Sequence, residues 1–310
     1  MGGCNKPPFF LKNMIERKTA TTIDMQIAKL RERGMVIANP NHVKEILLSV
    51  GYYRMGFYWY PFEISKLRKR GIHKFRRDTT WEKAEALYDF DSRFRNLLSY
   101  YLQIIETDIR TYLTYKASNY YKEDPFWFVN NSYVKSDFIS RFIGSPDVRG
   151  IYGNLRLNND VIKKHHRKHP EDIFAPAWKT LEFLMFGDIQ YLYNSILDKS
   201  LREKIYQRYD VDEEDDFVSY IDILRATRNV CAHSRVLYDK NLHHGIRGSQ
   251  VKLGLNTGEE MSIVGILKLV YYMLRQIDPE KEVEMRNALR NLVNQVEYDI
   301  VRFAISRLAF

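Results

Sequence analysis

Residues 81–120, WEKAEALYDFDSRFRNLLSYYLQIIETDIRTYLTYKASNY, contain few residues that break helices. Apolar side chains recur in this stretch at helical spacing and fall on one side: Leu87, Phe94, Leu98, Leu102, Ile105, Ile109 and Leu113. A stripe of this kind is typical of a helix that packs one face against a core. The stretch therefore predicts a long core helix over residues 81–120.

Shorter helical patterns lie on both sides of this stretch. They cover residues 22–34, 41–50, 176–196, 217–233, 262–276 and 280–308. Several begin or end at the expected signals, such as a threonine cap before the first and a glycine after the second. The sequence contains no internal repeat, no glycine-rich phosphate loop and no long series of alternating strands. The expected fold class is all-α, with a possible small β-hairpin near residues 62–78.

Composition bounds the domain organisation. A chain of 310 residues, 45% of them hydrophobic, can bury the core of one large domain or two small ones. We expect an N-terminal extension over residues 1–80, with short helices, an aromatic segment and a basic loop. Residues 81–310 are the expected helical domain. Within it, proline, glycine, asparagine and charges mix over 121–172, which is typical of an insertion with one or two short helices.

The formal net charge of +9 favours an acidic partner. Nucleic acid is favoured over a membrane surface, because aromatic residues interleave with the basic stretches. Cys4 and Cys231 are too few for a disulfide framework or a cysteine-based zinc site, which indicates a reducing compartment and by default the cytoplasm. No early segment resembles a secretion signal, and Lys268 interrupts the apolar pattern at 263–274, so no membrane segment is expected.

Two kinds of segment could contact RNA. Residues 52–62 include seven aromatics in eleven positions, which is more typical of a packed hub between helices than of a surface for stacking bases. The basic residues gather in two stretches, one with Lys66, Arg68, Lys69, Arg70, Lys74, Arg76 and Arg77, the other with Lys163, Lys164, Arg167 and Lys168. Both could follow a phosphate backbone, although a merely solvated surface explains the first equally well.

Histidines accompany the second basic stretch. His165 and His169 are one helical turn apart, as zinc ligands can be, but lysines and arginines crowd them and no acidic or cysteine ligand was identified nearby. We therefore expect a basic patch that faces solvent or RNA, and no metal site.

Residues 222–233, DILRATRNVCAH, are the best candidate for chemistry. Arg228, Asn229 and His233 lie within six residues of an amphipathic helix. Arginine binds phosphate with a fixed fork of donors, and histidine can take and give a proton near neutrality, so the set suggests work on a phosphodiester. The spacing alone is weak, because it is expected by chance with 8 histidines and many arginines, and it recurs from Arg68 to His73.

The helical wheel separates two of these residues. Asp222, Asn229 and His233 fall within about 20° of one line, whereas Arg228 lies about 140° from His233 and about 7.5 Å away along the axis. Distortion of the helix, the long arginine stem, or pairing of two such helices across a dimer axis could bring them together, and the dimer explains most. In the alternative interpretation, Arg228 pairs with an acidic neighbour and His233 is a cation at the helix C-terminus.

The string from Arg228 to Tyr238, RNVCAHSRVLY, resembles the signature of the bacterial Abi abortive-infection proteins of AbiD/AbiF type, a branch of the HEPN superfamily. Further landmarks agree in order: residues 26–34, 51–54, 87–91, 105–110, 176–178 and 182–187. The chain departs from the family pattern at 235–239, where RVLYD replaces the usual Arg-Leu-Trp-Asn. The resemblance implies a helical HEPN fold, a homodimer with a composite site, metal-independent RNA cleavage and a role in phage defence.

The leading hypothesis is an endoribonuclease without cofactor. His233 is the expected acid or base at a ribose 2′-hydroxyl, Arg228 stabilises the phosphoryl oxygens, and Asn229 orients the phosphate or His233. Asp222, Glu106 and Arg110 are candidates for supporting the site, although Glu106 and Arg110 are also explained as a local ion pair. The main alternative is a non-catalytic protein that holds a structured RNA in phage defence. A DNA-binding regulator is weaker, because no recognition helix emerges.

Overall fold

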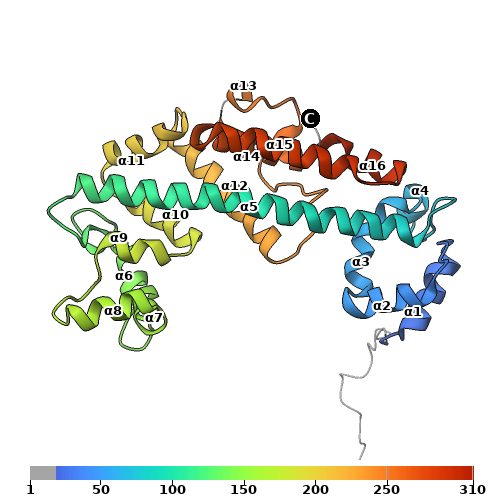
Figure 1. Cartoon of the computed structure of the whole chain (residues 1–310), viewed down its shortest axis with the longest axis horizontal. Coiled ribbons are helices and arrows are strands. Elements are labelled where there is room, and N and C mark those ends of the chain that lie inside the picture. The colour runs from blue at the N-terminus through green and yellow to red at the C-terminus, as the bar shows by residue number, and fades with distance from the viewer. Residues whose placement is uncertain (1–18, 249, 309) are drawn as a thin grey trace, which may run out of the picture. The chain divides into compact units, whose positions relative to one another are not determined.

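The computed structural model describes residues 19–248, 250–308 and 310 (Figure 1). The α-helices there are α1 Ile23–Glu32, α2 Pro40–Ser49, α3 Tyr52–Trp59, α4 Ser65–Arg68, α5 Trp81–Tyr120, α6 Ser136–Ile143, α7 Ile151–Asn158, α8 Asp160–Lys168, α9 Ala177–Thr180, α10 Phe186–Ser195, α11 Lys199–Tyr206, α12 Glu214–Ala232, α13 Gln250–Leu253, α14 Ile263–Ile277, α15 Pro279–Asn294 and α16 Asp299–Ile305. In these residues β-structure is limited to isolated bridges. The predicted all-α fold is confirmed.

The long helix α5 spans the predicted 40 residues. Its apolar stripe is buried as expected, from Leu87 and Phe94 to Ile109 and Leu113. The chain divides into two compact units, residues 1–88 and 89–310. The division falls inside α5, later than the expected boundary after residue 80.

The first turns of α5 belong to the smaller unit because their side chains pack there. The ring of Trp81 lies 6.0 Å from that of Trp59, and the rings of Tyr58 and Tyr88 are 5.2 Å apart. The predicted aromatic hub is confirmed for Tyr58, Trp59 and Phe62, which are buried, whereas Tyr53, Phe57 and Tyr60 are exposed.

In the larger unit, α12 packs against α10, α11 and α14. The predicted amphipathic helix packs its apolar side against the core, where Ile223, Leu224, Val230 and Cys231 are buried. Hydrogen bonds tie α5 to the elements around it, such as Tyr101 Oη to Glu284 Oε1 at 3.1 Å and Tyr209 Oη to Asp108 Oδ1 at 2.8 Å.

Four predicted elements differ in the structure. The possible hairpin at 62–78 is reduced to one antiparallel bridge between Glu63 and Phe75, because α4 occupies the middle of the segment. The stretch 121–172 contains three α-helices, α6, α7 and α8, where one or two were predicted. The predicted helix at 280–308 ends at Asn294, and the side chain of Arg302 donates to the carbonyl of Val296 in the break before α16.

The predicted helix at 176–196 is also interrupted. Leu184 and Met185 are extended, with ψ of 145° and 153°, and they separate α9 and a short 3-10 helix from α10. The break leaves the carbonyl of Leu184 outside helical pairing, where it accepts a hydrogen bond from Arg110 at 3.1 Å. Across the described residues, no helix combines the length and apolarity that crossing a membrane requires.

Candidate functional site

Helix α12 carries the Arg228, Asn229 and His233 motif. It begins at Glu214, earlier than the predicted 217, so that Glu214, Asp215 and Asp216 occupy its first turn. Carboxylates there are stabilised by the positive end of the helix dipole. The helix ends at Ala232, and His233 is its C-cap, whose backbone N–H donates to Asn229 O at 3.0 Å. His233 therefore stands at the first position beyond the helix.

A left-handed turn fixes this helix end. Ser234 has a φ of 51°. Its N–H donates to Cys231 O at 3.1 Å, and the N–H of Arg235 donates to Val230 O at 2.9 Å. This pair of bonds is the Schellman pattern, which usually has glycine at the left-handed position. The turn gives the His233 backbone a defined place.

A buried ion pair on α5 holds the chain just after the motif. Asp91 is fully buried, and its carboxylate accepts hydrogen bonds from the N–H groups of Leu237 at 3.1 Å and Tyr238 at 2.7 Å. Arg95 pairs with Asp91 and donates to Arg235 O at 3.3 Å. Residues 87–91 are a landmark of the family resemblance, but no role was predicted for Asp91. The available signal was two opposite charges, one turn apart, at helical spacing from Leu87 and Leu98 of the apolar stripe.

Arg228 faces a second acidic residue of α5. Its Nε lies 3.5 Å from Glu106 Oε2, an ion-pair distance without hydrogen-bond geometry. The other oxygen of Glu106 accepts from Arg110 Nη2 at 2.7 Å. Glu106 is buried, so it holds both guanidinium groups by charge in a poorly solvated place. The structure thus brings Arg228 together with two of the three predicted supporting residues.

The third supporting residue, Asp222, lies at the same cavity as Arg228 but pairs with another arginine. Its Oδ1 accepts from Arg225 Nη2 at 3.1 Å, and Arg225 Nε donates to Gln190 Oε1 at 2.8 Å. Asp222 therefore orients Arg225, and among the described residues its ion pair is with Arg225 rather than with Arg228 or His233. Arg225 was not among the predicted site residues, although it shares the polar side of α12 with Asn229.

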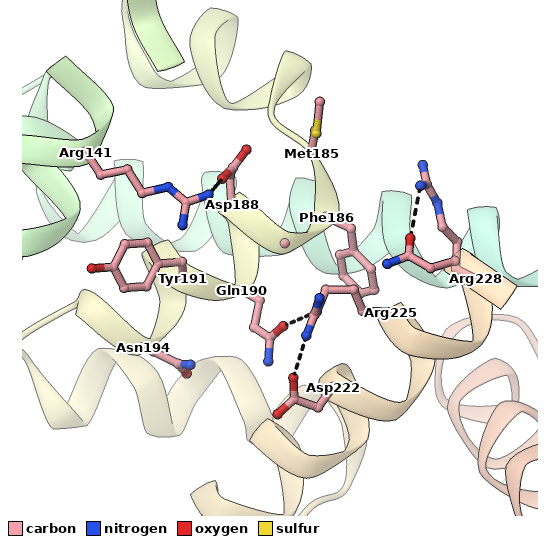
Figure 2. A pocket seen from close by; sticks show the side chains of 12 residues that line it. Arg141, Met185, Phe186, Asp188, Gln190, Tyr191, Asn194, Asp222, Arg225 and Arg228 are labelled. Atoms are coloured by element: carbon pink, nitrogen blue, oxygen red, sulfur yellow. Dashed lines mark hydrogen bonds and ion pairs between the residues drawn. The ribbon is translucent and has the colours of Figure 1, made fainter. Parts of the chain in front are cut away.

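These side chains meet at a cavity of about 560 Å³, which we call the arginine cavity. Its lining includes Arg141, Asp188, Gln190, Arg225, Arg228 and Asn229. Figure 2 shows Arg141 on the opposite side of the view from Arg225 and Arg228, with Gln190 between them. Burial raises the pKa of the Asp188 carboxyl, and the guanidinium of Arg141, 2.9 Å away, opposes this rise. Sequence reasoning missed Arg141, Asp188 and Gln190, because they come from helices far from α12 in the sequence.

His233 is not among the residues that line the arginine cavity. Its side chain is exposed beyond the end of α12. The wheel had predicted that Arg228 and His233 are angularly separated, and a single chain does not place both at this cavity. Cys231, in contrast, is buried, and burial raises the pKa of its thiol to about 11. A thiol of this kind is a poor nucleophile. Cys4 lies outside the described residues.

The two basic stretches differ in the structure. In the smaller unit, Lys66, Lys69, Arg70, Lys74, Arg76 and Arg77 are exposed, and Arg68 lies 3.7 Å from the centre of the Tyr60 ring. In α8, Lys163, Lys164, Arg167 and Lys168 are exposed as expected.

The expectation that the α8 histidines face outward was wrong for His165 and His166, which are buried. They follow Ile162 at helical spacing and share its core face, while the lysines and arginines lie on the other. His166 Nε2 and Tyr152 Oη share a hydrogen bond of 2.7 Å, and burial lowers the pKa of His166. Asp172 lies 3.0 Å from His165. No cluster of three or more metal-ligating side chains occurs within the described residues.

Comparison with known proteins gives one family. The model of the Abi-like protein family matches residues 45–239, which is more than half of the chain. That range contains α12, the Schellman turn, Asp91, Glu106 and the arginine cavity. No curated protein and no solved structure matches the chain. The chain belongs to the Abi-like protein family.

Proposed function

We propose that this protein is a metal-independent endoribonuclease of a bacterial abortive-infection system, an AbiD/AbiF-like member of the HEPN superfamily. Membership of the Abi-like protein family suggests the abortive-infection role. One observation carries the catalytic proposal: Glu106 pairs with Arg228 at the wall of a cavity that Asn229 also lines. Asn229 is one turn before His233, whose backbone caps the helix.

The proposed reaction is transesterification within RNA. The imidazole of His233 takes the proton of a ribose 2′-hydroxyl, and the 2′-oxygen attacks the adjacent phosphorus. The bond from phosphorus to the 5′-oxygen breaks, and that oxygen gains a proton from an acid in the site. The products carry a 2′,3′-cyclic phosphate and a 5′-hydroxyl. Arg228 stabilises the charge on the phosphoryl oxygens, and Asn229 orients the phosphate.

The separation of His233 from the arginine cavity supports a composite site. If two chains pair about a two-fold axis beside the exposed face of α12, the arginine, asparagine and histidine of both chains gather in one cleft. The proposal therefore includes a homodimer, in which the histidine of one chain serves the arginine of the other. The exposed basic residues of the stretches 66–77 and 163–168 would supply further phosphate contacts, with an affinity that falls as salt rises.

The decisive experiment is cleavage of mixed RNA by the purified protein in the presence of a chelator. The wild type should give products with 2′,3′-cyclic phosphate ends, and His233→Ala should give none while it keeps its fold and dimer. His243→Ala is the matched control, because His243 is also exposed and lies beyond the motif. A fully active His233→Ala would overturn the assignment.

One observation favours a second candidate, a non-catalytic RNA-binding protein. Within one chain, Arg228 and Asn229 line the cavity without His233, so they can hold a phosphate without a proton acceptor. This candidate predicts that the wild type binds RNA and leaves it intact, and that His233→Ala binds equally well.

A further inference from the structure

We propose that the arginine cavity is a subsite for one nucleotide of single-stranded RNA, next to the phosphodiester that is cleaved. Arg141 and Arg225 contact its phosphate, and Gln190 and Tyr191 contact its base. Only the statement that this nucleotide adjoins a cleaved bond rests on the proposed function. The binding of a nucleotide is argued from the cavity itself.

The charge of the cavity matches one phosphodiester. Its lining contains three arginines, Arg141, Arg225 and Arg228, and two carboxylates, Asp188 and Asp222, which leaves one net positive charge. A phosphodiester within RNA carries one negative charge, whereas a free nucleoside triphosphate carries several. The cavity therefore suits an internal nucleotide of a polynucleotide better than a free triphosphate.

The arginines are held in place and still present donors. Arg225 uses Nε toward Gln190 and Nη2 toward Asp222, and its Nη1 has no partner among the described residues. Arg141 uses Nη2 toward Asp188, and its side chain is 60% exposed. Because each guanidinium is anchored on one edge, little conformational entropy is lost when the other edge binds phosphate.

The same anchoring orients an amide for the base. An arginine can only donate hydrogen bonds, so Gln190 must turn its oxygen toward Arg225 and keep its NH2 group for another partner. Tyr191 lines the cavity beside Arg141, whose guanidinium lies 5.4 Å from the centre of the ring. A ring and a guanidinium plane are surfaces on which an unpaired base stacks.

The size of the cavity is also suitable. Its volume of about 560 Å³ lies inside the range of roughly 300–1,000 Å³ that is typical of sites for small ligands. One unstacked nucleotide fits such a volume, whereas a double helix does not. The expected ligand is therefore a single strand.

The test is a binding measurement on full-length His233→Ala, which removes turnover, with a fluorescein-labelled 12-nucleotide RNA of mixed sequence in chelator. Arg141→Ala or Arg225→Lys, each added to His233→Ala, should weaken binding about tenfold. A tenfold loss corresponds to the low end of the free energies of hydrogen bonds to charged groups, as expected at a half-exposed site. Arg141→Ala should also lower the slope of log affinity against log salt by about 0.7, the share of one contact to a single-stranded phosphate, whereas Arg225→Lys should leave this slope unchanged. Arg225→Lys keeps the positive charge but loses the planar guanidinium group, which can donate two parallel hydrogen bonds to a phosphate.

Arg290→Ala is the matched control, because Arg290 is an exposed arginine of α15 outside the cavity, and it should leave the affinity unchanged. Thermal melting of each variant separates loss of a contact from loss of the fold. If Arg225→Lys melts at a lower temperature than its parent, Arg141→Ala provides an independent test, because Arg141 is exposed. Unchanged affinity in folded Arg141→Ala and Arg225→Lys would overturn the subsite.

The two proposals fail in different ways. If the wild type cleaves RNA and neither variant alters affinity, the subsite is wrong and the nuclease stands. If the wild type cleaves nothing but binding depends on both arginines, the nucleotide-binding subsite stands and the nuclease assignment fails.

Discussion

Replacing Asp91 by alanine should be among the most damaging single changes in the larger unit. The carboxylate is fully buried, it accepts hydrogen bonds from the N–H groups of Leu237 and Tyr238, and it pairs with Arg95, which is 5% exposed. Alanine removes the carboxylate that pairs with this buried cation and that accepts from the two N–H groups. Breaking a buried pair from one side costs about 3–5 kcal/mol, which is a large part of a typical free energy of unfolding of about 5–15 kcal/mol.

Urea unfolding followed by circular dichroism measures this loss, and melting should show a midpoint lower by roughly 10 °C. Asp89→Ala is the control, because Asp89 is an exposed residue of the same helix and should change the free energy of unfolding by about 0.5 kcal/mol or less. Asp91→Leu combined with Arg95→Met removes both charges and should be less destabilised than Asp91→Ala alone.

The Asp91 change should also act on function. The segment 235–238 that Asp91 and Arg95 anchor begins two residues after His233, so its release should misplace the imidazole. At a temperature where Asp91→Ala remains folded, RNA cleavage should fall further than the folded fraction does. A variant as stable as Asp89→Ala would refute the view that the buried pair holds the end of the motif.

Three further predictions concern single contacts. Glu106→Gln removes the charge that orients Arg228 and Arg110, so kcat for RNA cleavage should fall about tenfold while RNA affinity stays equal or rises. The control Glu203→Gln changes an exposed residue and should leave kcat unchanged. An unchanged kcat in Glu106→Gln would contradict the role of Glu106. Ser234→Gly should have a free energy of unfolding about 1–2 kcal/mol higher than Ser234→Val, because a side chain disfavours the left-handed conformation of residue 234. Urea unfolding measures this difference, and equal midpoints for the two variants would argue against the turn. Burial raises the pKa of Cys231 to about 11, so its thiol stays protonated at pH 8. Iodoacetamide should therefore label the peptide that contains Cys231 in urea but not in the folded protein. Rapid labelling of the folded protein would contradict this burial.

Periodicity was enough to predict the helical scaffold. Helix α5 has the predicted extent, because one strong apolar stripe runs through it without interruption. The interruptions at Leu184 and after Asn294 were missed. In each, an arginine side chain donates to a backbone carbonyl of the break, Arg110 of α5 in the first case and Arg302, six residues beyond Val296, in the second. The spacing of apolar residues does not contain such contacts.

The site was predictable in part for the same reason. The motif on α12 and the Glu106 to Arg110 pair lie at short spacings that sequence displays directly. Arg141 and Gln190 join Arg225 at one cavity only through the packing of α6, α10 and α12, which brings together residues far apart in the chain. The outward basic face of α8 followed from its composition, but the burial of His165 and His166 needed the helical phase to be weighed as well.

The continuity of α5 determines how this protein can be dissected. The helix passes from one compact unit into the other without a loop, so the boundary between residues 88 and 89 offers no extended backbone for a protease to bind. Expression of residues 89–310 alone would cut α5 in its third turn and remove Trp81, Ala84 and Leu87, which are fully buried. A truncation designed at this boundary should therefore retain the whole of α5, and the apolar residues of its first turns should be replaced by polar ones.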